Sequence, residues 1–156
     1  MIHQLLLPNK YKKAGWLILV PATILGIILL FTGFEGMPLN TRVFAVLNNE
    51  ILGKNQSFSF IYTNVTPTIA GILFIAGALL VGFSKETNED EFISNLRLSS
   101  LLWAVLVNYI LLLFAFAFIY GTSFLSVMLY NMFTVLIIFI ARFNYVLYRN
   151  SKSVSE

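Results

Sequence analysis

Apolar residues fill four long stretches of the chain, and polar residues are concentrated between them. The stretches cover residues 14–34, 67–83, 99–120 and 124–148. A helix needs about 20 mostly apolar residues to cross a membrane, because the hydrocarbon layer is about 30 Å thick and a helix rises about 1.5 Å per residue. Three stretches reach that length, and residues 67–83 lie at the short end of the range. The pattern predicts an all-α integral membrane bundle of four transmembrane helices, in a single domain.

The ten Lys and Arg residues are divided unequally among the segments that join these stretches. With both termini in the cytoplasm, eight of the ten lie inside, and only Arg42 and Lys54 lie outside. Cytoplasmic loops of membrane proteins carry the excess of Lys and Arg. The sequence therefore predicts that both termini are cytoplasmic and that residues 35–66 form one outer loop.

Composition places the chain in the lipid bilayer, since 58% of its residues are hydrophobic and only 11% are charged. A soluble fold of this size would lack the polar surface needed to cover four helices that are apolar all round. The formal net charge of +3 reflects the Lys and Arg residues that orient the helices in the membrane. It is not read as a nucleic-acid surface, because no basic face is interleaved with aromatic residues on a soluble element.

The outer loop is too short to hold a hydrophobic core of its own, and we expect it to cap the outer ends of the helices. Phe58, Phe60 and Tyr62 recur at every second position, which indicates a short strand. Residues 42–52 fit a short helix on the membrane surface equally well.

The third helix is expected to begin before its apolar stretch, as a cytoplasmic extension. Thr87 followed by Asp90 resembles a capping box, and Glu89, Asp90 and Glu91 suit the first turn, where the helix dipole favours acids. The sequence therefore predicts a helix over residues 88–120, followed by a fourth helix over residues 124–148 after the tight turn at residues 121–123.

Phe92, Ile93 and Leu96 would form an apolar face on this extension. That face can meet a protein partner or a second copy of the chain, or it can pack on the inner ends of the chain's own helices. The candidate partner surface consists of Glu89, Asp90, Glu91, Phe92 and Leu96.

Polar residues inside the apolar stretches should face other helices, because an unpaired polar group is costly in hydrocarbon. Asn108 and Asn131 lie about 18 Å and 12 Å from the turn between the third and fourth helices, at about 1.5 Å per residue. A hydrogen bond between them, direct or through Thr134, would join the two helices. Arg142 can reach the inner headgroups or pair with the acidic residues at 89–91. A substrate site built on Asn108, Asn131 and Arg142 is the alternative.

Small residues four apart, Ala22 with Gly26 and Ala78 with Gly82, favour close packing of the first helix on the second. The same spacing would also serve a dimer interface.

The residue inventory restricts the chemistry. The chain has no cysteine, and its one histidine, His3, lies outside every apolar stretch, so we expect no thiolate site and no haem held by paired histidines. No Asp or Glu lies within a stretch, which disfavours a proton-coupled carrier. No grouping of a nucleophile with a base, or of metal ligands, is found. We therefore expect no enzyme activity, no metal and no cofactor.

The segments DEFISNLRLSSLLWAVLVNYILLLFAFAFIYG and YNMFTVLIIFIARFNYVLYRN resemble small four-span bacterial inner-membrane proteins, some of them associated with genes for helix-turn-helix regulators. The resemblance implies a bacterial inner membrane and a regulatory setting. It transfers no functional residue.

The sequence favours a non-enzymatic membrane protein: a small regulatory, sensory or accessory subunit whose cytoplasmic helix extension contacts a partner or another copy. The alternative is a small-molecule or ion conduit formed by oligomerisation, with Asn108 and Asn131 lining the pore. A lipid-modifying enzyme ranks third.

Overall fold

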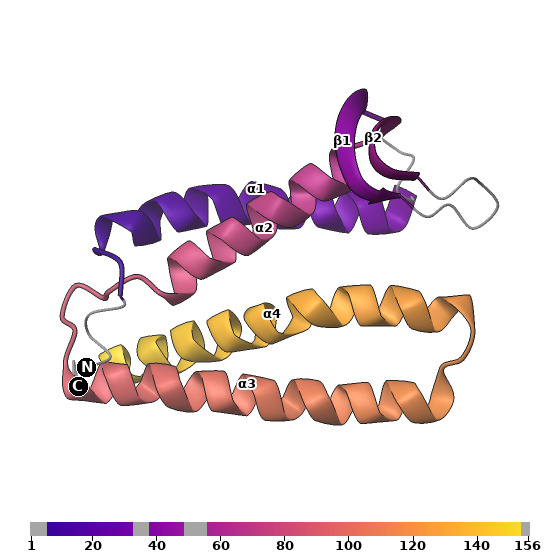
Figure 1. Ribbon diagram of the computed structural model, residues 1–156. Coiled ribbons are helices and arrows are strands. Elements are labelled where there is room, and N and C mark those ends of the chain that lie inside the picture. The colour runs from indigo at the N-terminus through magenta and orange to yellow at the C-terminus, as the bar shows by residue number, and fades with distance from the viewer. Residues whose placement is uncertain (1–5, 33–37, 49–55, 154–156) are drawn as a thin grey trace. The chain divides into compact units, whose positions relative to one another are not determined.

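The structure, a computed structural model, describes residues 6–32, 38–48 and 56–153 (Figure 1). The elements follow the order α1 (Lys10–Thr32), β1 (Asn40–Asn48), β2 (Gln56–Asn64), α2 (Thr66–Gly82), α3 (Glu91–Phe118) and α4 (Thr122–Ser153). In this part of the chain three helices, α1, α3 and α4, are long and apolar enough to cross a membrane. The apolar helix α2 is shorter, at 17 residues. A mostly helical protein with three helices long and apolar enough to span a membrane is thus confirmed, and a fourth crossing by α2 stays a prediction.

The helix ends differ from those expected because hydropathy marks only the part of a helix that lies in lipid. The helix α1 begins at Lys10, so its first turn contains cationic residues that the apolar stretch left out. The helix α4 continues to Ser153, because helical hydrogen bonding persists through the polar residues that follow the apolar stretch. The arrangement of the four helices in one bundle stays a prediction. The chain folds as two compact units, Met1–Leu19 with Ile75–Glu156, and Val20–Phe74.

In the first unit, α3 and α4 lie side by side and antiparallel (Figure 1). The helix α3 ends at Phe118, its C-cap Ile119 has an extended backbone, and Gly121 reverses the chain with a φ of +72°. Glycine suits this position because a side chain would strain that conformation. The face of α3 toward the core carries small and polar residues, and α4 contributes large rings. The buried residues include Ile93, Arg97, Ser100, Ala104, Asn108 and Ala115 of α3, and Phe139, Ile140 and Phe143 of α4.

Glycines allow the first unit's other helical segments to approach closely. An added Cβ at Gly77 of α2 would lie 2.8 Å from the backbone nitrogen of Leu19 in α1, and one at Gly82 would lie 2.6 Å from Cε1 of Phe139 in α4. Gly15 of α1 is equally tight against Leu80. Small residues therefore do bring α1 onto α2, but Gly82 serves the contact with α4 instead. Gly26 has no described atom within 4 Å of such a Cβ, so its predicted packing role is wrong.

The second unit contains a β-hairpin, which corrects the all-α class. The strands β1 and β2 pair antiparallel from Asn40 opposite Asn64 to Asn48 opposite Gln56. The strand expected around Phe58 and Phe60 is confirmed, and the helix considered for residues 42–52 is wrong where the structure describes them. Phe44 packs edge-on against Phe60 across the strands. Such aromatic pairs stabilise a sheet, and the run of β-branched and aromatic residues favours extended backbone over helix.

The hairpin is closed onto the start of α2 by short-range hydrogen bonds. The backbone N–H of Leu39 donates to Asn64 Oδ1 and Thr66 Oγ1, and the N–H of Val65 donates to the carbonyl of Leu39. The apolar stretch begins at residue 67, and the helix begins one residue earlier, at Thr66. The N–H of Thr66 donates to Asn64 Oδ1 at 3.0 Å.

The start of α3 corrects the predicted capping box. Asp90 is the N-cap, and its carboxylate accepts a hydrogen bond of 2.8 Å from the N–H of Ile93. Thr87 lies in an exposed turn before the helix. Of the three acidic residues expected in the first turn, only Glu91 lies there. The projection of α3 is thus shorter than expected, since it begins at Glu91 and not at Asn88.

Candidate functional site

Arg97 lies on the buried face of α3 and makes three side-chain hydrogen bonds. Its Nη1 and Nη2 donate to the two carboxylate oxygens of Glu89 at 2.8 and 3.2 Å, and Nη2 also donates to the carbonyl of Ser84 at 3.0 Å. Only 7% of the Arg97 side chain and 9% of the Glu89 side chain are exposed. A two-point contact of this kind is the strongest geometry for an Arg and a carboxylate. It fixes the loop between α2 and α3 onto α3.

A second ion pair extends this cluster to the N-terminal segment. Lys12 of α1 pairs with Glu86, whose own N–H donates to Glu89 Oε2 at 2.7 Å. Just before α1, Leu7 exchanges backbone hydrogen bonds with Phe83 and Lys85. We call Lys12, Ser84, Glu86, Glu89 and Arg97 the polar clasp. It joins the N-terminal segment, the end of α2 and the start of α3.

The polar clasp rests on an aromatic ring of α4. Phe143 is 1% exposed, and the guanidinium carbon of Arg97 lies 5.2 Å from its ring centroid. The Lys12 ammonium lies 6.0 Å from the same centroid. Both distances fit cation–π attraction, which strengthens where water is excluded. The clasp therefore also ties α4 to the loop between α2 and α3.

Asn108 and Asn131 face each other between α3 and α4. Each side-chain amide nitrogen donates to the other's carbonyl oxygen at 3.1 Å. Asn108 is 3% exposed, so the pair lies inside the helix interface. Thr134 takes no part in it, because its hydroxyl donates to the carbonyl of Tyr130 in its own helix. The structure thus brings Asn108 and Asn131 together and leaves Thr134 aside.

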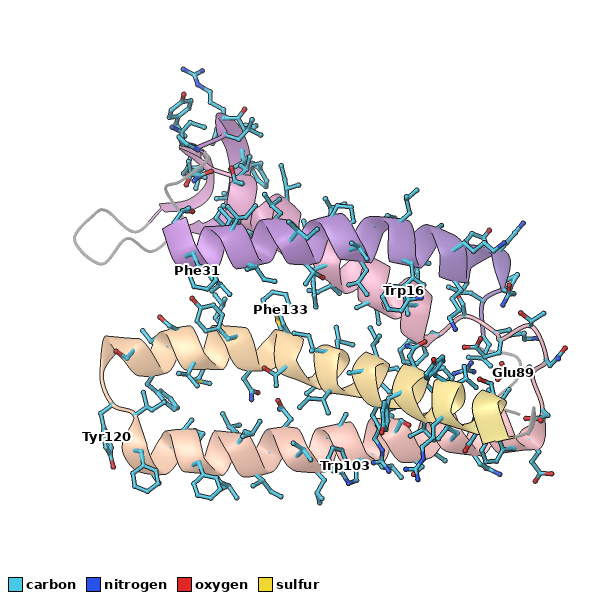
Figure 2. The ribbon with its side chains drawn as sticks, turned by 180° about the vertical axis from the view of Figure 1, so that it is seen from behind. Trp16, Phe31, Glu89, Trp103, Tyr120 and Phe133 are labelled. Atoms are coloured by element: carbon cyan, nitrogen blue, oxygen red, sulfur yellow. The ribbon has the colours of Figure 1, made fainter. Side chains whose placement is uncertain are left out.

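Arg142 lies apart from these pairs. Its guanidinium carbon is 4.6 Å from the ring centroid of Trp103, a residue of α3 (Figure 2). Its Nη1 is buried and has no hydrogen-bond partner among the described residues. Of the two alternatives for Arg142, pairing with the acidic residues at 89–91 is wrong, because Glu89 pairs with Arg97 and no described carboxylate lies within ion-pair distance of Arg142. Its reach to the headgroups stays a prediction. A substrate site on Asn108, Asn131 and Arg142 is not assembled in the described residues, because Arg142 contacts Trp103 and the two Asn residues bond to each other.

The residues of the predicted partner surface separate into two groups. Glu89 is used by Arg97, and Asp90 caps α3, so both have internal roles. Glu91 and Phe92 are exposed, Phe92 by 52%, and Leu96 is partly exposed. Ile93, which we placed on the same face, is buried against the chain's own helices.

The sequence analysis missed the polar clasp. Lys12 and Arg97 were counted only among the Lys and Arg residues that favour cytoplasmic termini, and Glu86 was treated only as part of a loop. A signal for Arg97 was present. Ile93, Arg97, Ser100, Ala104 and Asn108 recur three or four residues apart, so the cation falls on a face of small and polar residues. Such a face packs against a neighbouring helix, and a buried Arg there requires a carboxylate partner.

The described residues contain no group of three or more His, Cys, Asp or Glu side chains that could hold a metal ion. No family model, curated protein or solved structure matches the chain. The resemblance to four-span bacterial inner-membrane proteins is therefore one of sequence pattern alone.

Proposed function

We propose that this chain is a non-enzymatic membrane subunit, regulatory, sensory or accessory in role, that contacts a protein partner through the exposed start of α3. We also propose that it resides in a bacterial inner membrane with both termini cytoplasmic, as the distribution of Lys and Arg favours. The observation that carries the proposal is the exposed Phe92 on a helix start held in place from its other side.

The intramembrane polar residues support a structural use over substrate binding. The amides of Asn108 and Asn131 each donate one hydrogen bond to the other, so both side chains turn toward the interface of α3 and α4. Hydrogen bonds between membrane helices typically contribute about 0.6 to 2 kcal/mol, enough to set the register of α3 against α4. This arrangement favours a subunit role over the conduit.

The start of α3 is held in place by contacts on its buried side. Arg97 and Ile93 anchor this turn, and Asp90 caps it. On the opposite side, Phe92 lies seven residues before Ser99, about 10 Å beyond the apolar stretch at about 1.5 Å per residue. An aromatic ring held outside the hydrocarbon gains little from lipid tails. A protein partner with an apolar pocket would cover it.

The experiment is photo-crosslinking in cells that express the full chain. p-Benzoylphenylalanine is placed at Phe92 or Leu96, and in a control at Phe118, which is 75% exposed at the far end of α3. The proposal expects one and the same partner protein at the first two positions. The partner should also copurify in mild detergent at fixed stoichiometry. Phe92→Glu should abolish both signals and leave the amount of inserted chain unchanged.

Three outcomes would contradict the proposal. Crosslinks from Phe92 and Leu96 that reach only the chain's own helices would show internal packing. Crosslinks only to a second copy would make the surface a homo-oligomer contact. An equal yield of the same adduct from Phe118 would show that the contact is unspecific.

A further inference from the structure

The side of α3 that carries Trp103 has a shallow groove. It holds about 420 Å³ and is lined by Asn95, Leu98, Ser99, Leu102, Trp103 and Leu106. Three of the lining residues are leucines four apart along the helix, each 46% to 63% exposed. The two polar residues, Asn95 and Ser99, lie at the end of the groove nearer the start of α3. The groove is therefore apolar along most of its length and polar at one end.

A cation lies next to this groove. Trp103 forms part of the groove wall and also carries the Arg142 guanidinium at 4.6 Å from its ring centroid. Arg142 has no ion pair with any described residue, and its buried Nη1 has no hydrogen-bond partner there. Arg142 as a whole is only partly buried, and a charged donor that lacks a partner is costly, so this arrangement favours an acceptor from outside the described residues.

The depth of the pair matches the headgroup boundary. Arg142 lies 20 residues after the start of α4 at Thr122, about 30 Å along the helix at about 1.5 Å per residue. That distance equals the thickness of the hydrocarbon layer, about 30 Å. Trp and Arg are both typical of this boundary. A phosphate at this depth would come from lipid, and its acyl chain would run toward the membrane centre, along Leu102 and Leu106.

We propose that the groove on α3 and the Trp103–Arg142 pair bind one anionic phospholipid. Its phosphate accepts hydrogen bonds from the Arg142 guanidinium, its polar headgroup lies at Asn95 and Ser99, and an acyl chain covers Leu102 and Leu106. The planar guanidinium suits a phosphate because it can donate two parallel hydrogen bonds. Stacking on Trp103 holds it in place for that contact. This site is separate from the partner contact at Phe92, and either can fail without the other.

The test uses tryptophan fluorescence, since the chain has only two tryptophans. In a Trp16→Phe background, Trp103 is the sole reporter. The protein is reconstituted into vesicles of phosphatidylcholine mixed with phosphatidylglycerol, in which one lipid or the other carries brominated acyl chains that quench on contact. We expect Trp103 to contact phosphatidylglycerol about five times more often than phosphatidylcholine, as measured by quenching from the brominated form of each lipid. This is the preference that one cation gives for an anionic lipid.

Arg142→Gln should remove this preference, and Arg142→Lys should keep part of it, because Lys retains the charge without the planar fork. The matched control is Arg149→Gln, which removes an equal charge from an exposed position further along α4 and should retain most of the preference. Equal quenching by the two lipids in the unmodified chain would overturn the proposal. So would a preference that Arg142→Gln leaves intact, or one that Arg149→Gln abolishes equally. If Arg142→Gln does not fold, the comparison of the unmodified chain with Arg142→Lys decides.

Discussion

Arg97 and Glu89 form a two-point ion pair, in which two guanidinium nitrogens donate to two carboxylate oxygens at 2.8 and 3.2 Å. The residues are eight apart in sequence, and Glu89 lies before the helix that carries Arg97. The pair therefore holds a non-helical segment against the side of α3. Phe143 of α4 lies under the same guanidinium, which makes Arg97 the point where three parts of the chain meet.

Arg97→Gln should lower the free energy of unfolding by about 3 kcal/mol, because it leaves the Glu89 carboxylate buried without a cation. Arg97→Lys should cost less, since Lys keeps the charge but loses the two-point contact. The measurement is unfolding in mild detergent by SDS titration, followed by circular dichroism. Arg149→Gln, at an exposed position, is the control and should change stability by less than about 0.5 kcal/mol. Equal losses at positions 97 and 149 would contradict a stabilising role for the polar clasp.

Asn108→Leu and Asn131→Leu should each cost no more than about 2 kcal/mol, because each removes one side of a reciprocal amide pair. The double variant should lose less than the sum of the single variants, since it leaves no unpaired amide between the helices. The same SDS titration supplies the four free energies of this cycle. Thr134→Val is the control and should show no coupling to either Asn, because its hydroxyl bonds within its own helix. Strictly additive losses would show that the two amides act independently.

Gly77→Ala should destabilise the chain by about 1 to 3 kcal/mol, because its Cβ would meet the backbone of Leu19, which cannot rotate away. Gly26→Ala changes the same residue type in α1 and meets no described atom within 4 Å. It should be neutral or gain up to about 1 kcal/mol from better helix propensity. Thermal unfolding in detergent compares the two variants. A greater loss for Gly26→Ala would mean that the close approach of α1 and α2 at Gly77 is wrong.

Asp90→Ala should destabilise the start of α3 by about 1 kcal/mol, the usual cost of losing an N-cap side chain. Thr87→Ala should have less than half that effect, since Thr87 lies in an exposed turn. Amide hydrogen exchange over the first turn of α3 measures both, with the N–H of Ile93 as the most sensitive site. Faster exchange in Thr87→Ala than in Asp90→Ala would restore the capping box that the structure replaces.

Hydropathy alone identified α1, α3 and α4 as the helices long and apolar enough to cross a membrane, because about 20 apolar residues in succession have few other uses in a protein. The pairing of Asn108 with Asn131 followed from their positions near the middle of two antiparallel helices joined by a short turn. Those features depend on local pattern and on helix geometry, which the sequence carries directly.

The first residue of α3 depends on which of several possible capping residues is used, and the sequence leaves that choice open. Thr87, Asn88 and Asp90 are all residue types that cap helices. Asp90 is the cap in the structure, and Glu89 lies before the helix, where it pairs with Arg97. That ion pair forms only in the folded chain. Likewise, a surface helix over residues 42–52 was compatible with the sequence, and the structure instead pairs residues 42–48 with β2, since strand pairing is a non-local property.

The position of α2 relative to the membrane decides the topology, and with it the side on which Phe92 and the polar clasp lie. Single cysteines at Ser57, Asn88 and Ser153 provide a clean test, because the chain has no native cysteine. A membrane-impermeant maleimide is added to intact cells and then to permeabilised cells. We predict that Ser57→Cys is labelled in intact cells and that Asn88→Cys and Ser153→Cys are labelled only after permeabilisation. Labelling of Asn88→Cys in intact cells together with Ser57→Cys would show that α2 does not cross, and would contradict the four-span account.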